Sequence, residues 1–152
     1  MKRMLVTASL GLLIGTVAIV NAQKPVTQME VYKSPTCGCC AKWVEHVRQA
    51  GFTVQVKEMD DAALDAFKTK NGVPRTAQSC HTALIGGYVV EGHVPAAEIS
   101  RMLKERPAVQ GIAVGGMPAG SPGMEQGGRR DAYDVVLVLP DGRTTIYARY
   151  GR

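Results

Sequence analysis

The sequence lacks the basic stripe interleaved with aromatic residues that marks many nucleic-acid-binding surfaces. The chain has 152 residues and a formal charge of +5, but only 5% of its residues are aromatic. Its lysines and arginines are scattered, and Arg129 and Arg130 form the only tight basic pair after the N-terminal segment. No internal repeat is visible either. We therefore expect no nucleic-acid partner.

The sequence also lacks an apolar run long enough to be a clear membrane anchor. The run from Met4 to Val20 is short for a spanning helix, which needs about 20 residues. It follows the basic pair Lys2-Arg3 and precedes Ala22, which is typical of a cleaved signal peptide. We expect residues 1–22 to be removed after Ala22, giving a periplasmic protein with a charge of +3. Membrane contact is expected only through an uncleaved signal peptide.

Cysteine is scarce, and three of the four cysteines fall within four positions. Cys37, Cys39 and Cys40 form a CxCC motif, and Cys80 is followed directly by His81. Cys37 and Cys40 have the CxxC spacing of thiol–disulfide enzymes, but a third thiolate between them would compete in that chemistry. Thiolates also bind Cu(I), zinc and iron–sulfur centres, where one sulfur can bridge two ions. Metal binding is favoured over a framework of two ordinary disulfides, because adjacent Cys39 and Cys40 cannot easily pair.

Residues 23–152 are long enough for one compact domain. Hydrophobic periodicity and turn residues predict an α/β domain with the element order β-α-β-α-β-β-α, which is the thioredoxin-like arrangement. Residues 111–152 add a loop rich in Gly, Pro and Met, at 111–128, and a β-hairpin. The predicted strands are 28–32, 52–59, 82–85, 88–91, 133–139 and 143–150, and the predicted helices are 39–50, 62–70 and 95–106.

A thioredoxin-like fold would bring the cysteines together. Its reactive cysteines lie where the first strand ends and the first helix begins, and amide groups and the helix dipole favour thiolate there. The loop entering the third strand lies against that site and usually carries a cis-proline. Here Cys80 and His81 take this place, and Pro74 is the remaining candidate for the cis-proline. Trp43, one turn into the helix, is expected to pack beside the site.

A series of motifs in a fixed order covers most of residues 23–152. The motifs lie at residues 32–40, 43, 51–52, 72–74, 79–83, 86–88, 91–96, 116–118 and 123–125. They resemble the CopG copper-resistance family, small periplasmic proteins of thioredoxin-like fold. The resemblance implies copper ions, Cu(I) or Cu(II), as the partner, bound through the CxCC cysteines, and it suggests a role in interconverting or handling copper ions. It leaves open a multinuclear, cysteine-bridged cluster and contacts with other periplasmic copper-handling proteins.

Four more residues are candidate metal ligands beside the cysteines. His81 neighbours Cys80, and His93 precedes the last predicted helix, from where it could bend back to the site. Met117 and Met124 lie in the long loop, and thioethers suit Cu(I), although gap-filling packing is the alternative. His46 is instead expected on the helix surface, about 10 Å along the axis from the motif.

Three functions stay open from the sequence alone. The favoured one is a copper-binding protein of copper resistance, for which turnover as a copper oxidoreductase is undecided and no catalytic residue is assigned. The second is a thiol–disulfide oxidoreductase using Cys37 and Cys40. The third is a zinc-binding structural module that uses Cys80 with the motif. The crowded thiols and the methionine-containing loop favour copper over zinc.

Overall fold

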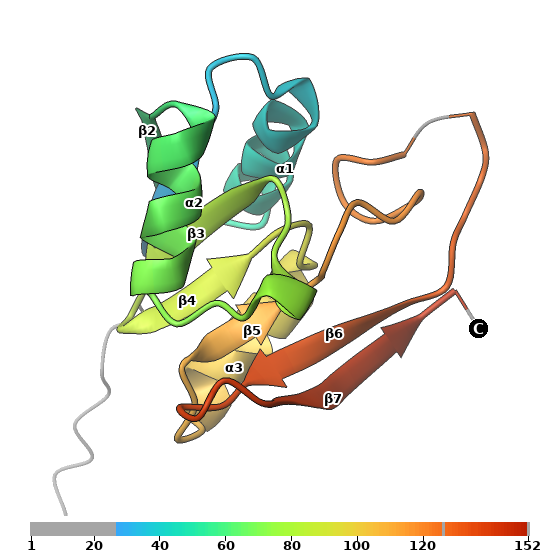
Figure 1. Cartoon of the computed structure of the whole chain (residues 1–152). Coiled ribbons are helices and arrows are strands. Elements are labelled where there is room, and N and C mark those ends of the chain that lie inside the picture. The colour runs from blue at the N-terminus through green and yellow to red at the C-terminus, as the bar shows by residue number, and fades with distance from the viewer. Residues whose placement is uncertain (1–26, 126, 152) are drawn as a thin grey trace, which may run out of the picture.

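A computed structural model describes residues 27–125 and 127–151, which build a mixed α/β fold around one seven-stranded sheet (Figure 1). The strand order is β2-β1-β3-β4-β5-β6-β7. Strands β1 and β2 are parallel, as are β4 and β5, and the other neighbours are antiparallel. The expected signal peptide lies outside the described residues. The elements are β1 (Gln28–Lys33), α1 (Gly38–Gln49), β2 (Thr53–Glu58), α2 (Asp61–Lys70), a 3₁₀ turn η1 (Arg75–Ala77), β3 (His81–Ile85), β4 (Tyr88–Glu91), α3 (Ala96–Glu105), β5 (Gly111–Ala113), β6 (Tyr133–Val138) and β7 (Thr144–Tyr150).

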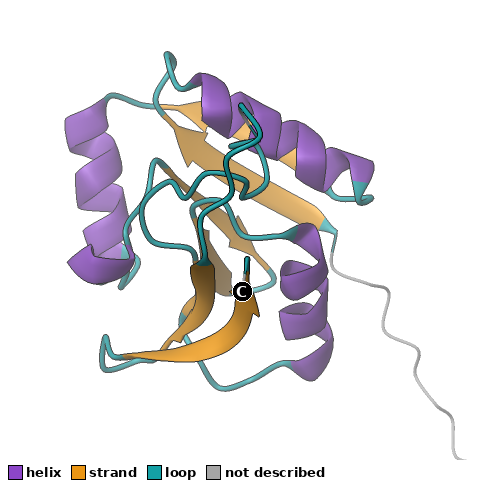
Figure 2. Ribbon diagram, turned by 90° about the vertical axis from the view of Figure 1, so that its right-hand side faces the viewer, coloured by secondary structure: helices purple, strands orange, loops and turns teal. Residues whose placement is uncertain are grey.

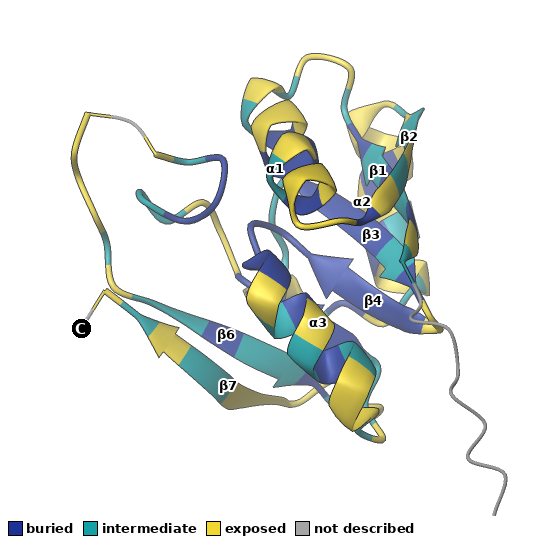
Figure 3. Cartoon of the chain, turned by 180° about the vertical axis from the view of Figure 1, so that it is seen from behind, coloured by how far each residue is buried: buried dark blue, intermediate teal, exposed yellow. Residues whose placement is uncertain are grey.

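The helices cover opposite faces of the sheet. Helices α1 and α3 lie on one face and α2 on the other, as a comparison of Figure 1 with the view from behind in Figure 3 shows. Val47 of α1 and Ile99 of α3 are fully buried against Val31 and Ala83 of the sheet. This apolar layer fixes the end of β1 and the start of α1 relative to β3, which are the segments that carry the cysteines.

The C-terminal hairpin extends the same sheet. Strands β6 and β7 pair with each other, and β6 pairs with β5, so the hairpin is part of the core structure (Figure 2). Arg101 of α3 stacks on the ring of Tyr147 in β7, with the guanidinium carbon 3.6 Å from the ring centroid. The Tyr150 hydroxyl donates to Glu98 at 2.8 Å. These contacts attach β7 to α3.

The predicted order β-α-β-α-β-β-α is confirmed for residues 28–105, and the chain is of the α/β class. The assignment to the thioredoxin-like folds stays a prediction. Asp60 caps α2, because its side chain accepts the Ala63 amide N–H at 2.8 Å. No helix in residues 27–125 and 127–151 has the length and apolar character to cross a membrane.

Two predictions were wrong in detail. Residues 111–128 are not entirely loop, because Gly111–Ala113 forms β5 beside β4. An added Cβ at Gly111 would collide with the backbone of Val89, so the strand needs glycine there. Pro74 is not a cis-proline, since no cis peptide bond occurs in the part of the chain that the structure describes.

Candidate metal centre

The CxCC motif lies at the junction of β1 and α1, where the sequence predicted it. Cys37 is the N-cap residue of α1, and its sulfur accepts the backbone N–H of Cys40 at 3.3 Å. The amide groups and the positive end of the helix dipole therefore face the motif and favour negative charge on its sulfurs. Cys40 is fully buried, while Cys37 and Cys39 are half-buried.

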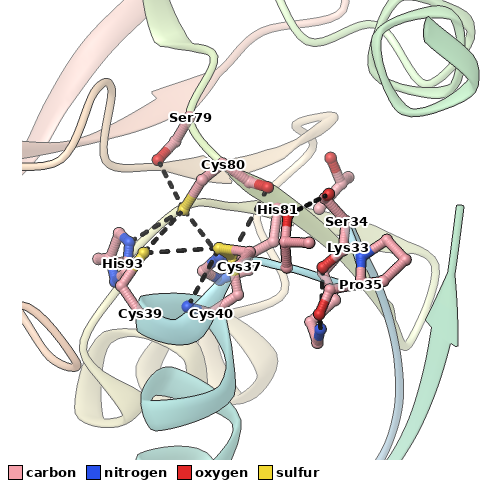
Figure 4. The surroundings of a disulfide bond; sticks show 12 residues. Lys33, Ser34, Pro35, Cys37, Cys39, Cys40, Ser79, Cys80, His81 and His93 are labelled. Atoms are coloured by element: carbon pink, nitrogen blue, oxygen red, sulfur yellow. Dashed lines mark hydrogen bonds between the residues drawn. A yellow bond between two sulfur atoms is a disulfide. The ribbon is translucent and has the colours of Figure 1, made fainter. Parts of the chain in front are cut away.

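All four cysteines converge on one point (Figure 4). Cys37 and Cys40 form a disulfide with a Cα–Cα distance of 5.4 Å, and Cys39 and Cys80 are free thiols. The Cys39 sulfur lies 3.5 Å from that of Cys37 and 3.9 Å from that of Cys80. Reduction of the disulfide would thus place four thiols together, which is a donor set suited to soft metal ions.

Cys80 sits immediately before β3, at the centre of this group. Its sulfur lies within 3.9 Å of the Cys39 sulfur and of the Ser79 hydroxyl oxygen. Burial raises the pKa of the Cys80 thiol to about 12, and the neighbouring Cys39 makes a smaller contribution in the same direction. The metal-free protein therefore holds Cys80 as a thiol, and a bound metal ion has to displace this proton.

His93 is oriented with one ring nitrogen toward Cys80. Its Nδ1 lies 2.8 Å from the carbonyl oxygen of Pro122 and donates to it, and its Nε2 lies 3.1 Å from the Cys80 sulfur. This backbone bond fixes the tautomer and leaves Nε2 as the nitrogen with a lone pair, the pattern found in metal-bound histidines. Burial lowers the pKa of His93 and so favours the neutral ring, the form that binds a metal ion.

His81 also faces the cysteines, although it neighbours Cys80 in sequence. Cys80 precedes the strand, so the two side chains do not alternate, and His81 Nδ1 lies 3.4 Å from the Cys80 sulfur. The ring is fully buried between Trp43, at 4.4 Å between centroids, and His93, at 5.1 Å. Trp43 thus packs beside the site as predicted. Burial lowers the pKa of His81 well below its usual value.

A buried nitrogen at this site lacks a partner. The Nε2 of His81 has no hydrogen-bond partner within the residues described, although burial of an unpaired polar atom is costly. His81, His93 and Cys80 have ligand atoms within 4.8 Å of one another, as do the four cysteines. The two groups share Cys80. The donors present therefore fit a soft or borderline metal ion, and their ligand roles stay predictions.

The loop between β5 and β6 closes over the site from one side. The Gly116 amide donates to Gln78 at 3.0 Å, and the Ser79 hydroxyl donates to the Gly116 carbonyl. Near the middle of the loop, an added Cβ at Gly123 would lie 2.9 Å from the Cys39 carbonyl oxygen. Gly116 and Gly123 thus both lie against cysteine-bearing segments.

The two loop methionines differ in exposure. Met117 follows Gly116 and is 55% exposed. Met124 follows Gly123 and is half-buried, and its carbonyl accepts the Gly120 amide N–H at 3.0 Å. Both methionines are next to the glycines that lie against cysteine-bearing segments, which is compatible with the predicted role of their thioethers as metal ligands. That role stays a prediction.

Access to the sulfurs is open on the α2 side. A cavity of about 300 Å³ is lined by Cys37, Cys80, Ser79 and Lys68, with Asp61 and Asp65 at its wall. A larger cavity of about 380 Å³ lies along β1 and β2, between residues 28–30 and 53–55, and none of the cysteines lines it. Small ligands can therefore reach Cys37 and Cys80 while Cys40 stays buried.

His46 is not the surface residue that the sequence suggested. It is half-buried, and its Nε2 accepts the backbone N–H of Ala96 at 3.1 Å. It caps α3, whose N-cap residue Pro95 makes no side-chain hydrogen bond. The contact joins residues fifty positions apart, so helical periodicity in α1 could not reveal it.

A buried ion pair beside the site was also not predicted from the sequence. Lys68 of α2 and Glu91 of β4 approach to 2.8 Å, and Glu91 accepts the backbone N–H of Ser79 at 2.7 Å. Burial raises the pKa of Glu91, and Lys68 opposes this shift. The sequence did contain one indication that Lys68 is buried. It follows the core residue Leu64 by four positions and so shares its buried helix face.

Comparison with known proteins supports the resemblance seen in the motifs. Residues 77–124 match a family described as "Protein of unknown function, DUF411". The fold is similar to "Copper resistance protein copG- Form 2", with 44% identity, a TM-score of 0.76 and coverage of 84% of this chain and 100% of that one. "Copper resistance protein copG- Form 1" is similar at 43% identity, with a TM-score of 0.76 and coverage of 84% and 99%. No curated protein matches. At this identity over most of both chains, the protein belongs to the CopG copper-resistance family.

Proposed function

We propose that this protein is a periplasmic copper-binding protein of copper resistance, exported by the segment at residues 1–22. Copper is its cargo, held by the cysteine group Cys37, Cys39, Cys40 and Cys80 in the reduced protein. The observation that carries the proposal is the clustering of four cysteine sulfurs within 4.8 Å of one another, next to a second group in which the imidazoles of His81 and His93 lie equally close to the shared Cys80. The names of the similar structures, which are copper-resistance proteins, agree with this donor set.

The number of sulfurs favours more than one copper ion per chain. Thiolates can bridge two ions, and the Cys39 sulfur lies within 3.9 Å of the sulfurs of both Cys37 and Cys80. Cys39 is therefore the candidate bridging ligand of a multinuclear cluster. His81 and His93 are proposed as nitrogen ligands at one side of the cluster, and Met117 and Met124 as thioether ligands from the loop.

The mixture of donors also supports interconversion of copper oxidation states. Thiolate and thioether sulfur stabilise Cu(I), whereas imidazole binds both Cu(I) and Cu(II). The sulfur group and the Cys80–His81–His93 group share one sulfur, so an ion bound at their junction has both kinds of donor within reach. Each copper ion that changes oxidation state would accept one electron from a redox partner or donate one electron to it.

A thiol–disulfide oxidoreductase is the second candidate, and one observation favours it. The Cys37–Cys40 disulfide lies at a helix N-terminus, and Cys37 lines an open cavity. Against it stands Cys39, whose free thiol is 3.5 Å from the Cys37 sulfur and would intercept a mixed disulfide with a substrate.

The variant Cys39→Ser separates the two candidates. It leaves the Cys37–Cys40 pair intact, so a disulfide enzyme should keep its insulin-reducing activity or gain some. A copper protein should instead lose bound Cu(I) in its reduced form, because the central sulfur is gone. Full copper loading by Cys39→Ser together with retained or increased disulfide reduction would reverse the order of the two candidates.

A further inference from the structure

The Cys37–Cys40 disulfide divides the four cysteines into two unlike pairs. Cys37 and Cys40 are bonded to each other and have no thiol to offer. Cys39 and Cys80 stay free, with their sulfurs 3.9 Å apart. Two ligands that bind one ion through bonds of about 2.3 Å at trigonal or tetrahedral angles lie about 4 Å apart, so this free pair already has the spacing of a metal site.

A third donor points at the same place. His93 Nε2 lies 3.1 Å from the Cys80 sulfur, and its orientation is held from the other side of the ring by the Pro122 carbonyl. Figure 4 shows the sulfurs of Cys39 and Cys80 and the ring of His93 on the same side of the disulfide. None of these three donors belongs to the disulfide.

We propose that the protein with its disulfide closed keeps a metal site of its own, formed by Cys39 Sγ, Cys80 Sγ and His93 Nε2, that takes one soft monovalent ion such as Cu(I). This inference rests on the proposed copper function and adds a redox state to it. Binding forms two metal–sulfur bonds and one metal–nitrogen bond and releases the two thiol protons. No electron is transferred in this step.

Opening the disulfide changes the capacity of the same site. A dithiol reductant would supply two electrons and two protons, becoming a disulfide itself, and Cys37 and Cys40 would become thiols. The number of cysteine thiols available to bind metal would then rise from two to four. The protein thus holds one ion in the oxidised form and more than one in the reduced form, and the thiol redox state sets how much copper it carries.

The test uses the mature protein with the disulfide closed, verified by two free thiols per chain and by peptide mapping of the Cys37–Cys40 bond. Tetrakis(acetonitrile)copper(I) is added without oxygen, and unbound Cu(I) is removed by a weak chelator. We expect one copper per chain and a thiolate-to-copper band in the ultraviolet. Alkylation of Cys39 and Cys80, followed by mass spectrometry, should slow by at least about tenfold when copper is bound.

Matched variants identify the ligands. The double variant Cys37→Ser/Cys40→Ser cannot form the disulfide but keeps the proposed site, so it should also bind one Cu(I). His93→Gln should weaken Cu(I) binding by at least about tenfold with the disulfide unchanged. Cys39→Ser with the disulfide closed should retain no Cu(I) against the chelator. Circular dichroism melting of each metal-free variant shows whether it is folded.

The outcomes distinguish this inference from the proposed function. If the reduced protein binds Cu(I) and the oxidised protein binds none, the separate site is excluded while the copper function stands. A second disulfide between Cys39 and Cys80, seen as zero free thiols in the oxidised protein, would also overturn the inference. If neither form binds Cu(I), the proposed function itself fails.

Discussion

Lys68 and Glu91 form an ion pair that is almost completely withdrawn from water. The ammonium and carboxylate groups are 2.8 Å apart, and their side chains are 2% and 0% exposed. The same carboxylate accepts the Thr82 hydroxyl at 2.6 Å and the Ser79 amide at 2.7 Å. Because Ser79 precedes Cys80, this network anchors the segment that places the Cys80 sulfur among the other ligands.

Removing one partner of this pair should be costly. Lys68→Met leaves a buried carboxylate without its cation, and we expect a loss of about 3–5 kcal/mol in the free energy of unfolding. The double variant Lys68→Met/Glu91→Gln removes both charges and keeps an acceptor for the Ser79 amide, so it should recover much of the loss. Urea unfolding of the metal-free proteins measures both. A double variant no more stable than the single one would contradict this account.

The close approach of the loop to α1 gives a second prediction. An added Cβ at Gly123 would lie 2.8 Å from the Trp43 backbone nitrogen, and neither backbone can move without repacking. Gly123→Ala should therefore detach the loop and expose Cys39 to alkylation several times faster. Gly128→Ala is the matched control, since Gly128 also has a positive φ, of 72°, but meets nothing within 4 Å. Equal alkylation rates in the two variants would argue against a closed loop.

The cap that His46 provides for α3 predicts a pH dependence. Burial lowers the pKa of His46 below its usual value of 6.5, and Glu125 opposes this shift. The unprotonated ring nitrogen is the form that accepts the Ala96 N–H. The folded protein thus binds this proton less readily than the unfolded chain does. The stability that His46 contributes is complete above pH 6.5 and is lost as the pH falls through the lowered pKa.

His46→Gln isolates this effect, because glutamine can accept the same N–H without titrating. His81 and His93 also have lowered pKa values, but they are common to both proteins and cancel in the comparison. Thermal unfolding of the metal-free proteins is measured from pH 8 to pH 5. The melting temperature of the variant should rise relative to that of wild type as the pH falls. A difference in melting temperature that stays constant with pH would show that the His46 ring is not held neutral.

Much of this molecule could be predicted from its sequence, and the failures share a cause. The helices and strands of residues 28–105 are long enough for their periodicity to be visible, whereas β5 has three residues and is defined by its pairing with β4. The cysteine cluster was conspicuous because cysteine is rare in the chain. The cap by His46 and the Lys68–Glu91 pair join distant segments, so the partners of His46 and Lys68 could be identified only from the three-dimensional structure.

The pairing of the cysteines is another property that sequence could not decide. The CxxC spacing allowed a Cys37–Cys40 bond, yet the same residues also suited a metal cluster. The structure shows the disulfide and the metal-like convergence together, with Cys39 and Cys80 left free. Disulfide chemistry and metal binding are therefore both predicted for the same four cysteines.

The loop methionines should affect copper release more than folding. Met117→Leu/Met124→Leu keeps the apolar volume and removes both thioether donors. If either sulfur binds Cu(I), copper should pass to a Cu(I) chelator several times faster at unchanged thermal stability, and its oxidation by air should quicken. Equal transfer rates would make both residues packing residues and confine the ligands to the cysteines and histidines.

The most direct test of the account is the metal content of the fully reduced mature protein, loaded without oxygen in the presence of both Cu(I) and zinc. Copper, zinc and protein are measured in the same sample after removal of weakly bound metal, and the measurement is repeated on Cys39→Ser. We predict more than one copper per chain, little zinc, and a lower copper content in the variant. A single zinc ion per chain, or one copper ion that the loss of Cys39 leaves unchanged, would contradict a copper site built on the converging cysteines.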